Sequence, residues 1–160
     1  ERLLDVGAGS AVLSIAGVLL GAGSALAIEG DELAVPTARA NAERNGVHDR
    51  VEVVHARVDA ADLARIGGEA GGFDGVMCNI EGHLLAPLLP GLIAAIRPGG
   101  WLLLSGSLDD QWNWFEAEVT GRGPTLEATD ADGEWRSGRF RAGSDHAAAR
   151  GPVPGTPPRR

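Results

Sequence analysis

Segments typical of strands and segments typical of helices alternate along this chain, and that alternation limits its possible folds more than any other feature. Short apolar runs that predict strands occupy residues 3–6, 24–29, 50–56, 73–80 and 101–107. Stretches that predict helices occupy residues 11–20, 31–47, 61–67, 83–100 and 109–123. This order is typical of parallel strands joined by right-handed crossover connections. We therefore predict an α/β fold with a doubly wound, mostly parallel sheet.

The two ends of the chain differ from this pattern. Residues 125–141 contain two strand-like runs around the turn sequence DADG, which predicts a C-terminal antiparallel hairpin. The sequence AGSDHAAARGPVPGTPPRR that follows is rich in Gly, Pro and Ala, so we expect a folded domain at residues 1–141 and a disordered tail at 142–160. The chain opens with Glu1 directly at a predicted strand and without an initiator Met, so we expect that the N-terminal part of a longer protein is missing.

Composition and charge narrow the class of protein. With 44% hydrophobic and 22% charged residues, 160 residues suit one soluble domain with a real core. No apolar run reaches the ~18 residues of a membrane span and no secretory signal is readable, so we expect a cytoplasmic protein. The single cysteine, Cys78, excludes an internal disulfide framework, leaves too few thiols for a zinc cluster, and gives no reason to expect a metal. A net charge of −8 argues against binding nucleic acid through its phosphates and suits a basic or neutral partner.

The loop after the first predicted strand, in LLDVGAGSAVLSIAG, carries the motif D-x-G-x-G at Asp5, Gly7 and Gly9. Ligands of doubly wound sheets lie outside the carboxyl ends of the strands, where glycines let the backbone approach them closely. Taken alone, the motif also fits a tight strand-to-helix turn. Glu29, however, ends the second predicted strand 22 residues after Gly7, close to the spacing at which a carboxylate accepts hydrogen bonds from both ribose hydroxyls. The two features together predict an adenosine site.

An adenosine site leaves two cofactors open. The nicotinamide dinucleotide fingerprint has glycine or alanine at the last position of G-x-G-x-x-G, where this chain has Val12. S-adenosyl-L-methionine needs only the acidic residue and the first two glycines. The loop therefore favours S-adenosyl-L-methionine over an NAD-dependent oxidoreductase, for which we also identify no proton-transfer group.

Segments spread over the whole chain resemble the bacterial PrmA family, class I methyltransferases with a Rossmann-like fold that modify large-subunit ribosomal protein eleven. The segments are LLDVGAGSAVLSIA, ARANAERNGVHDRVEV, FDGVMCNIEGHLLAPLLPGL, IRPGGWLLLSGSLDDQ and the late GEW. The most specific pieces are Asn79-Ile80 followed by Pro87-Leu88, the AERNGV block, and PGG leading into LSG. The resemblance covers nearly all of residues 3–139, in order.

This resemblance implies roles for four residues. Gly7 and Gly9 would approach the methionine part of S-adenosyl-L-methionine, and Glu29 would hold its ribose. Asn79 would lie at the junction of donor and acceptor, which makes it both a cofactor-binding and the candidate catalytic residue. The resemblance also implies an N-methyltransferase whose acceptors are lysine side chains and an N-terminal α-amino group of a ribosomal protein.

The chain departs from the family pattern at several positions. Glu29 replaces the usual aspartate and Ala11 the usual glycine, and we expect both replacements to fit. An aspartate near the end of the third strand often faces the adenine amino group in the family, whereas here Arg57 is in approximate register and Asp59 follows two residues later. The family's substrate-recognition domain, which precedes the first strand, has no counterpart in this sequence. A small-molecule methyltransferase and a non-catalytic S-adenosyl-L-methionine-binding fragment therefore remain alternatives.

Overall fold

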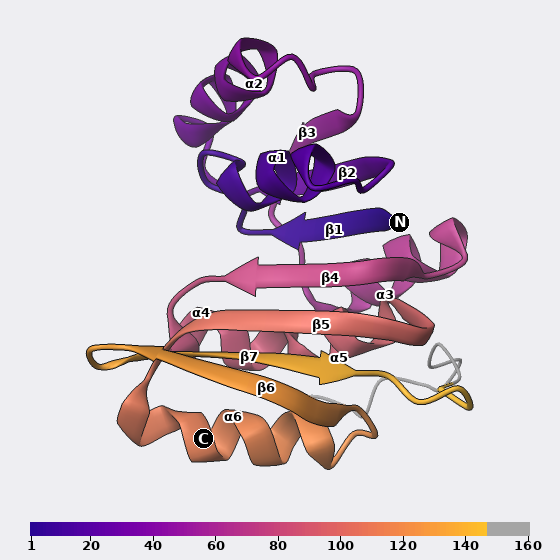
Figure 1. The fold of residues 1–160 in the computed structure, drawn as a ribbon, viewed down its shortest axis with the longest axis vertical. Helices are drawn as coiled ribbons and strands as arrows, with labels where there is room; N and C mark the ends of the chain where they lie inside the picture. The colour runs from indigo at the N-terminus through magenta and orange to yellow at the C-terminus, as the bar shows by residue number, and fades with distance from the viewer. Residues whose placement is uncertain (147–160) are drawn as a thin grey trace, which may run out of the picture.

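A computed structural model, which describes residues 1–146, contains one seven-stranded sheet with the order β3-β2-β1-β4-β5-β7-β6 (Figure 1). Its strands are β1 (Arg2–Val6), β2 (Ser24–Glu29), β3 (Val51–His55), β4 (Phe73–Asn79), β5 (Ile96–Leu108), β6 (Thr125–Asp132) and β7 (Trp135–Arg141). The pairs among β1 to β5 are parallel, whereas β7 pairs antiparallel with both β5 and β6. The predicted doubly wound, mostly parallel sheet with a C-terminal antiparallel hairpin is confirmed.

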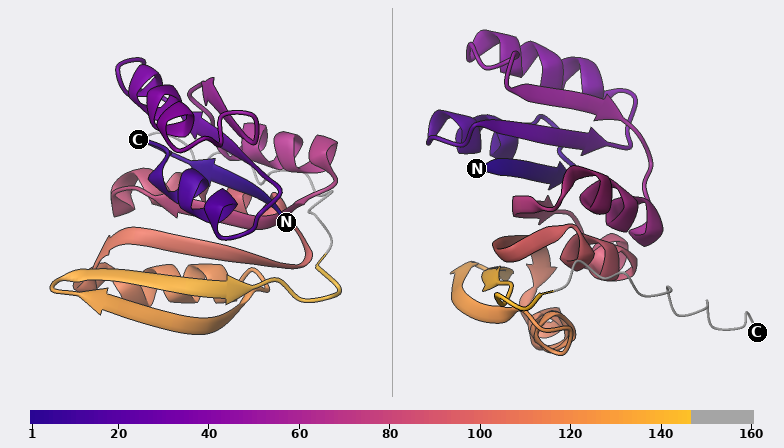
Figure 2. Two further views of the ribbon diagram at one scale, coloured as in Figure 1. Left: turned by 45° about the horizontal axis from the view of Figure 1, so that its top comes forward. Right: turned by 90° about the vertical axis from the view of Figure 1, so that its right-hand side faces the viewer.

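The helices lie on both faces of the sheet (Figures 1 and 2). They are α1 (Val12–Leu19), α2 (Ala34–Arg44), α3 (Ala60–Ala70), α4 (Gly82–Leu85), the 3-10 turn η1 (Ala86–Leu88), α5 (Leu89–Ala94) and α6 (Asp109–Thr120). Helices α1 and α2 pack on one face in a core that includes Leu3 and Met77. Helices α3 to α6 pack on the other face in a second core that includes Leu4 and Val76. Because neighbouring residues of β1 and β4 point into different cores, both faces of these strands are covered, and most of their central residues are apolar.

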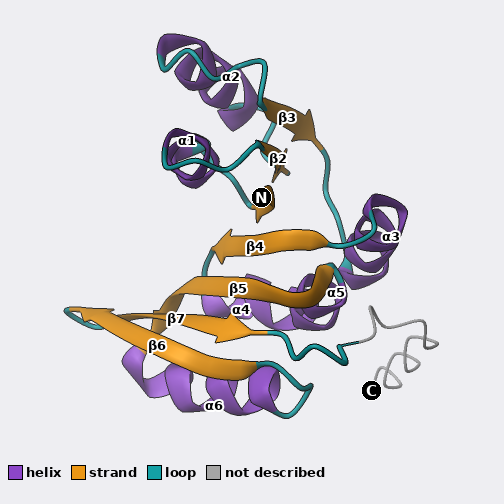
Figure 3. Cartoon of the chain, turned by 45° about the vertical axis from the view of Figure 1, so that its right-hand side comes forward, coloured by secondary structure: helices purple, strands orange, loops and turns teal. Residues whose placement is uncertain are grey.

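Helix α6 covers the C-terminal hairpin (Figure 3). The ring of Trp112 on α6 lies 6.1 Å from the ring of Phe140 on β7. At Gly138, also on β7, a Cβ would lie 2.3 Å from the Trp112 ring, so only glycine lets the helix approach this closely. The hairpin is therefore a fixed part of the sheet, and its β6–β7 turn lies at the edge where the parallel strands end.

Two boundaries differ from the sequence-based expectation. The predicted helix at 83–100 is divided into α4, η1 and α5, with Pro87 and Pro90 at the divisions, because proline has no N–H to continue a helix. Strand β5 already begins at Ile96, which pairs with Phe73 of β4.

The first residue of the expected tail, Ala142, still contacts the sheet. The buried Ala142 donates its N–H to the carbonyl of Gly100 at 2.9 Å. The rest of the predicted tail, residues 147–160, lies outside the described residues. Among the described helices, none is long and apolar enough to cross a membrane.

Candidate functional site

The order of the sheet reverses at β1, because β2 and β3 lie on one side of it and β4 and β5 on the other. A doubly wound sheet binds its ligand in the crevice outside the carboxyl ends of the strands at such a point. The loops that follow β1, β2 and β4 meet here. Gly7 and Gly9 lie in the first of these loops, and Glu29 and Asn79 end the strands that precede the other two.

The loop after β1 requires glycine at Gly7. The N–H groups of Gly7 and Ala8 both donate to the carbonyl of Ile28, at 2.9 and 3.2 Å, which ties this loop to β2. Gly7 has φ 72°, and a Cβ placed on it would lie 2.4 Å from Cγ2 of Ile80. Ile80 follows Asn79 directly, so the glycine loop packs against the loop that carries Asn79.

Ile80 is held from a second direction by Gly106 of β5. Gly106 has φ 86°, and a Cβ there would lie 2.4 Å from the carbonyl oxygen of Ile80. Ile80 therefore fits between two glycines that have no space for a side chain. The sequence analysis assigned no role to Ile80 or Gly106, since neither carries reactive chemistry; the signals were their places in the Asn79-Ile80 pair and in the LSG segment.

Glu29 joins the loops after β1 and β2. Its carboxylate accepts hydrogen bonds from the N–H of Gly9 at 2.6 Å and from the N–H of Asp31 at 2.7 Å, one on each oxygen. The side chain is buried, with 9% of the residue exposed. A carboxylate oxygen has two lone pairs, so each oxygen of Glu29 retains one for a further donor.

Asp5 lies beneath this loop and contributes a second buried carboxylate. Its Oδ2 accepts hydrogen bonds from the N–H and the hydroxyl of Ser14, at 3.2 and 2.8 Å. Burial raises the pKa of Asp5, the two bonds from Ser14 partly oppose that rise, and the negative charge of Glu29 adds to it. Asp5 thus connects the start of α1 to the end of β1. The D-x-G-x-G motif did not indicate this role in the sequence analysis.

Ala11 adopts a left-handed conformation, with φ 62°, at the start of α1. It is the only non-glycine residue with positive φ in the part of the chain that the structure describes. The family's usual glycine has no penalty in this conformation, whereas alanine does. Ala11 fits, as expected, but in a strained conformation, and its methyl group is fully buried.

Replacing Ala11 tests this balance. We expect Ala11→Gly to leave the free energy of unfolding within about 1 kcal/mol of the parent, because relief of backbone strain is offset by a lost buried methyl group and by added chain entropy. Ala11→Val should cost about 2 kcal/mol or more, since a β-branched residue is poorly tolerated at positive φ and must also fit a closed site. Urea unfolding of both variants measures the difference, and equal stabilities would contradict the strained conformation.

Two adjoining hollows occupy this edge of the sheet. The Glu29 hollow, of about 310 Å³, is lined by residues that include Gly7, Glu29, Gly30, Asp31, Arg57, Ile80 and Leu84. The Asn79 hollow, of about 600 Å³, is lined by Asn79, Ile80, Glu81, Leu84, Ser105, Gly106, Asp132 and Trp135. Ile80 and Leu84 line both, so the two hollows share an apolar wall. The exposed Asn79, at the end of β4, lies just across this wall from Gly7 and Glu29.

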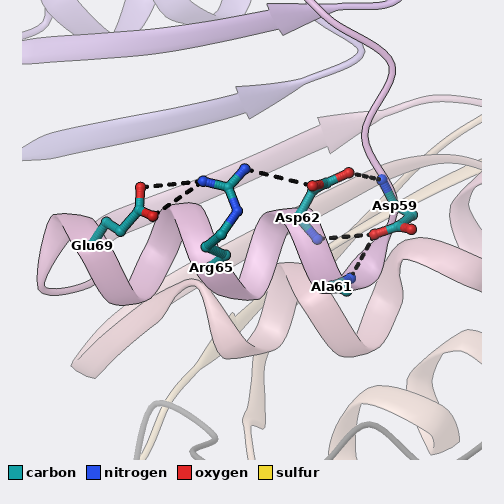
Figure 4. Close-up of polar contacts among 5 residues, drawn as sticks. All are labelled: Asp59, Ala61, Asp62, Arg65 and Glu69. Carbon is teal, nitrogen blue, oxygen red and sulfur yellow. Dashed lines mark hydrogen bonds and ion pairs between the residues drawn. The ribbon is translucent and has the colours of Figure 1, made fainter.

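Arg57 and Asp59, which the sequence analysis compared as possible adenine contacts, have different roles. Arg57 lines the Glu29 hollow and packs over Gly30, where a Cβ would lie 3.3 Å from its Cγ. Asp59 instead caps α3: its Oδ1 accepts from the N–H groups of Ala61 and Asp62, at 2.8 and 2.9 Å (Figure 4). The Asp62 carboxylate in turn accepts from the N–H of Asp59 at 3.3 Å. The sequence D-A-A-D is thus a capping box, and Asp59 does not line either hollow.

Comparison with known proteins identifies the family to which this arrangement belongs. The model of the family described as ribosomal protein L11 methyltransferase (PrmA) matches residues 1–142.

The chain belongs to the PrmA family.

Among curated PrmA proteins, that of Sorangium cellulosum is 38% identical over 152 residues, which cover 91% of this chain and 45% of that protein. The protein of Gloeobacter violaceus is also 38% identical, over 146 residues that cover 90% of this chain and 44% of that protein. The chain thus spans less than half the length of these PrmA relatives.

Two solved structures have a similar fold, and one of them is a PrmA relative. The ribosomal protein L11 methylase of Lactobacillus delbrueckii subsp. bulgaricus superposes with a TM-score of 0.77 at 27% identity, covering 88% of this chain and 70% of that one. An RNA methyltransferase from Salinibacter ruber, solved in complex with S-adenosyl-L-homocysteine, has a TM-score of 0.64 at 19% identity and covers 91% of this chain and 82% of that one. The second likeness shows a shared fold only.

Proposed function

We propose that this chain binds S-adenosyl-L-methionine in the Glu29 hollow and transfers its methyl group to an amine of ribosomal protein L11 in the Asn79 hollow. The observation that carries the proposal is that Ile80 and Leu84 line both hollows, so the two adjoin along these side chains. A methyl donor and its acceptor have to meet without water between them, and two hollows that adjoin along apolar side chains at the carboxyl edge of the sheet suit that requirement.

The residues of the Glu29 hollow fit the proposed donor. Each oxygen of the Glu29 carboxylate has a lone pair free for a ribose hydroxyl, in addition to the bond that it accepts from the backbone. A Cβ at Gly9 would meet nothing within 4 Å, so this part of the loop borders open space that a ligand can enter. Family membership supports the same ligand over NAD.

In the Asn79 hollow, the chain's task is to place an amine. S-adenosyl-L-methionine supplies an electrophilic methyl group whose bond to a positively charged sulfur breaks as the bond to a neutral amine nitrogen forms. The side-chain carbonyl of Asn79 is an acceptor that can hold an N–H of the amine and so direct its lone pair. Orientation of this kind supplies on the order of 7 to 11 kcal/mol in favourable cases. The apolar side chains of Ile80 and Leu84 reduce the local water content, which lowers the pKa of a lysine amine and favours its neutral form.

Calorimetric titration with S-adenosyl-L-homocysteine tests the donor site, with NAD as the competing ligand. We expect S-adenosyl-L-homocysteine to bind with measurable heat and NAD to give none. Asn79→Ala should lower methyl transfer to ribosomal protein L11 by about 100-fold, well beyond any loss of affinity for S-adenosyl-L-homocysteine, since Asn79 contacts the donor only at its junction with the acceptor and mainly orients the acceptor. Heat from NAD alone would overturn the proposal, and unchanged transfer by Asn79→Ala would remove Asn79 from its proposed role.

A further inference from the structure

The C-terminal hairpin places two side chains at the Asn79 hollow. Asp132, the last residue of β6, is paired with Trp135, the first residue of β7, across the turn. Directly paired residues in an antiparallel ladder point to the same face, with Cβ atoms about 5 Å apart. Trp135 is also paired with Leu108 of β5, so the turn is anchored to the strand that carries Ser105. Asp132 therefore has a defined position at the mouth of the hollow and is not on a free loop.

Glu81, two residues after Asn79, provides a second carboxylate to the same hollow. Its contact is with Nδ1 of His83, at 3.4 Å, and its side chain is 73% exposed. Asp132 is exposed as well and forms no ion pair within residues 1–146. Neither carboxylate is neutralised by an arginine of the described part of the chain.

Arginines do lie nearby, but they contact other carboxylates. Arg136 pairs with Asp109 at 2.6 Å, while Arg139 and Arg141 both pair with Glu127, at 3.0 and 2.8 Å. The residues that line the Asn79 hollow include two carboxylates and no Lys or Arg. The Glu29 hollow, in contrast, has Arg57 in its wall. Arg57 offsets part of the charge of Glu29 and Asp31 there, whereas no basic residue lines the Asn79 hollow, where the acceptor is proposed to enter.

The position of these carboxylates indicates what they attract. A carboxylate in contact with the reacting nitrogen would stabilise its protonated form and slow methyl transfer. Glu81 and Asp132 are exposed at the rim, where charges act over roughly a Debye length of 8–10 Å on groups that approach through water. They are therefore suited to the positive residues that flank a reacting amine.

We propose that Glu81 and Asp132 select acceptor amines that lie within a basic segment of polypeptide. This inference rests on the proposed function, because it assumes that the Asn79 hollow receives the acceptor. It adds that the flanking sequence of the acceptor is recognised by charge. Such rim charges mainly change the rate of association and its dependence on salt.

The test compares two short peptides on the chain saturated with S-adenosyl-L-homocysteine. Both peptides contain one lysine, flanked by arginines in the first and by serines in the second. Binding is followed by the NMR signal of the Trp135 indole N–H, assigned with Trp135→Phe. We expect the basic peptide to bind more tightly at low salt and this preference to fall sharply in about 0.5 M NaCl.

Charge-neutralising variants locate the effect. Glu81→Gln combined with Asp132→Asn should weaken binding of the basic peptide by about fivefold at low salt. The affinities for the serine-flanked peptide and for S-adenosyl-L-homocysteine should be nearly unchanged. The matched control is Glu43→Gln combined with Glu52→Gln, which removes two exposed carboxylates on α2 and β3 and should retain the preference.

Equal weakening by both double variants would show an effect of net charge alone and overturn the inference. So would a preference that persists in Glu81→Gln/Asp132→Asn. A chain that does not bind S-adenosyl-L-homocysteine would instead contradict the proposed function. In that case the two peptides are compared without S-adenosyl-L-homocysteine. Loss of the preference in Glu81→Gln/Asp132→Asn but not in the control double variant would still support recognition by these two carboxylates.

Discussion

Replacing Gly7 by alanine is expected to reduce the affinity for S-adenosyl-L-homocysteine by about 100-fold and the free energy of unfolding by roughly 2–4 kcal/mol. Two separate effects combine at this position. Alanine is strained at φ 72°, and its Cβ would lie 2.4 Å from Cγ2 of Ile80. Ile80 is β-branched and has the Gly106 backbone on its other side, so it cannot move away without displacing the loop that carries Asn79. Calorimetry and urea unfolding measure the two losses.

Gly46 offers a matched control for the backbone part of this effect. It ends α2 with φ 66°, and a Cβ there would have nothing within 4 Å. Gly46→Ala should therefore cost only about 1–2 kcal/mol, from the left-handed conformation, and leave ligand binding unchanged. If Gly7→Ala and Gly46→Ala lose the same stability and both bind normally, the contact between Gly7 and Ile80 has no role in forming the site.

The architecture was predictable because the pattern that determines it is local. Apolar runs of strand length, helical spacing between them and a turn at DADG were sufficient to predict a doubly wound sheet with a terminal hairpin. The start of β5 was not predictable, because Ile96 becomes part of the strand through its pairing with Phe73, and such a tertiary contact leaves no mark in the IRPGG sequence. Pro87 and Pro90 were visible signals of a divided helix, but the apolar spacing around them suggested a continuous one.

The site was predictable only where it contains reactive or conformationally special residues. Gly7, Gly9 and Glu29 could be proposed from motif and spacing and Asn79 from the resemblance to the PrmA family, and the fold brings the segments that carry them to one edge. Ile80 is an ordinary apolar residue in sequence, and its position between two glycines appears only in three dimensions. Asp59 shows the converse: D-A-A-D before a helix is a readable capping signal, and it accounts for the carboxylate that follows two residues after Arg57, the residue in approximate register with the family's adenine contact.

Glu29→Ala should weaken binding of S-adenosyl-L-homocysteine by about 100-fold, because it removes the acceptor proposed for two ribose hydroxyls. The structure adds a second consequence. The N–H groups of Gly9 and Asp31 donate to the two oxygens of Glu29, so alanine would leave both without this partner and cost about 1–3 kcal/mol of stability. Glu29→Gln should lose less affinity and less stability than Glu29→Ala, since its amide retains one accepting oxygen. Calorimetry and thermal unfolding of both variants separate the two effects.

Glu32→Ala is the control for removing a carboxylate near this loop without these contacts, since Glu32 is exposed. We expect it to bind and unfold like the parent chain. The comparison distinguishes two roles that Glu29 combines. If Glu29→Ala lowers stability but binds the ligand normally, Glu29 only connects the loops after β1 and β2. If neither affinity nor stability changes, Glu29 is not part of the site. Loss of both, with Glu29→Gln intermediate, is the result expected when one carboxylate shapes the glycine loop and also contacts the ligand that the loop receives.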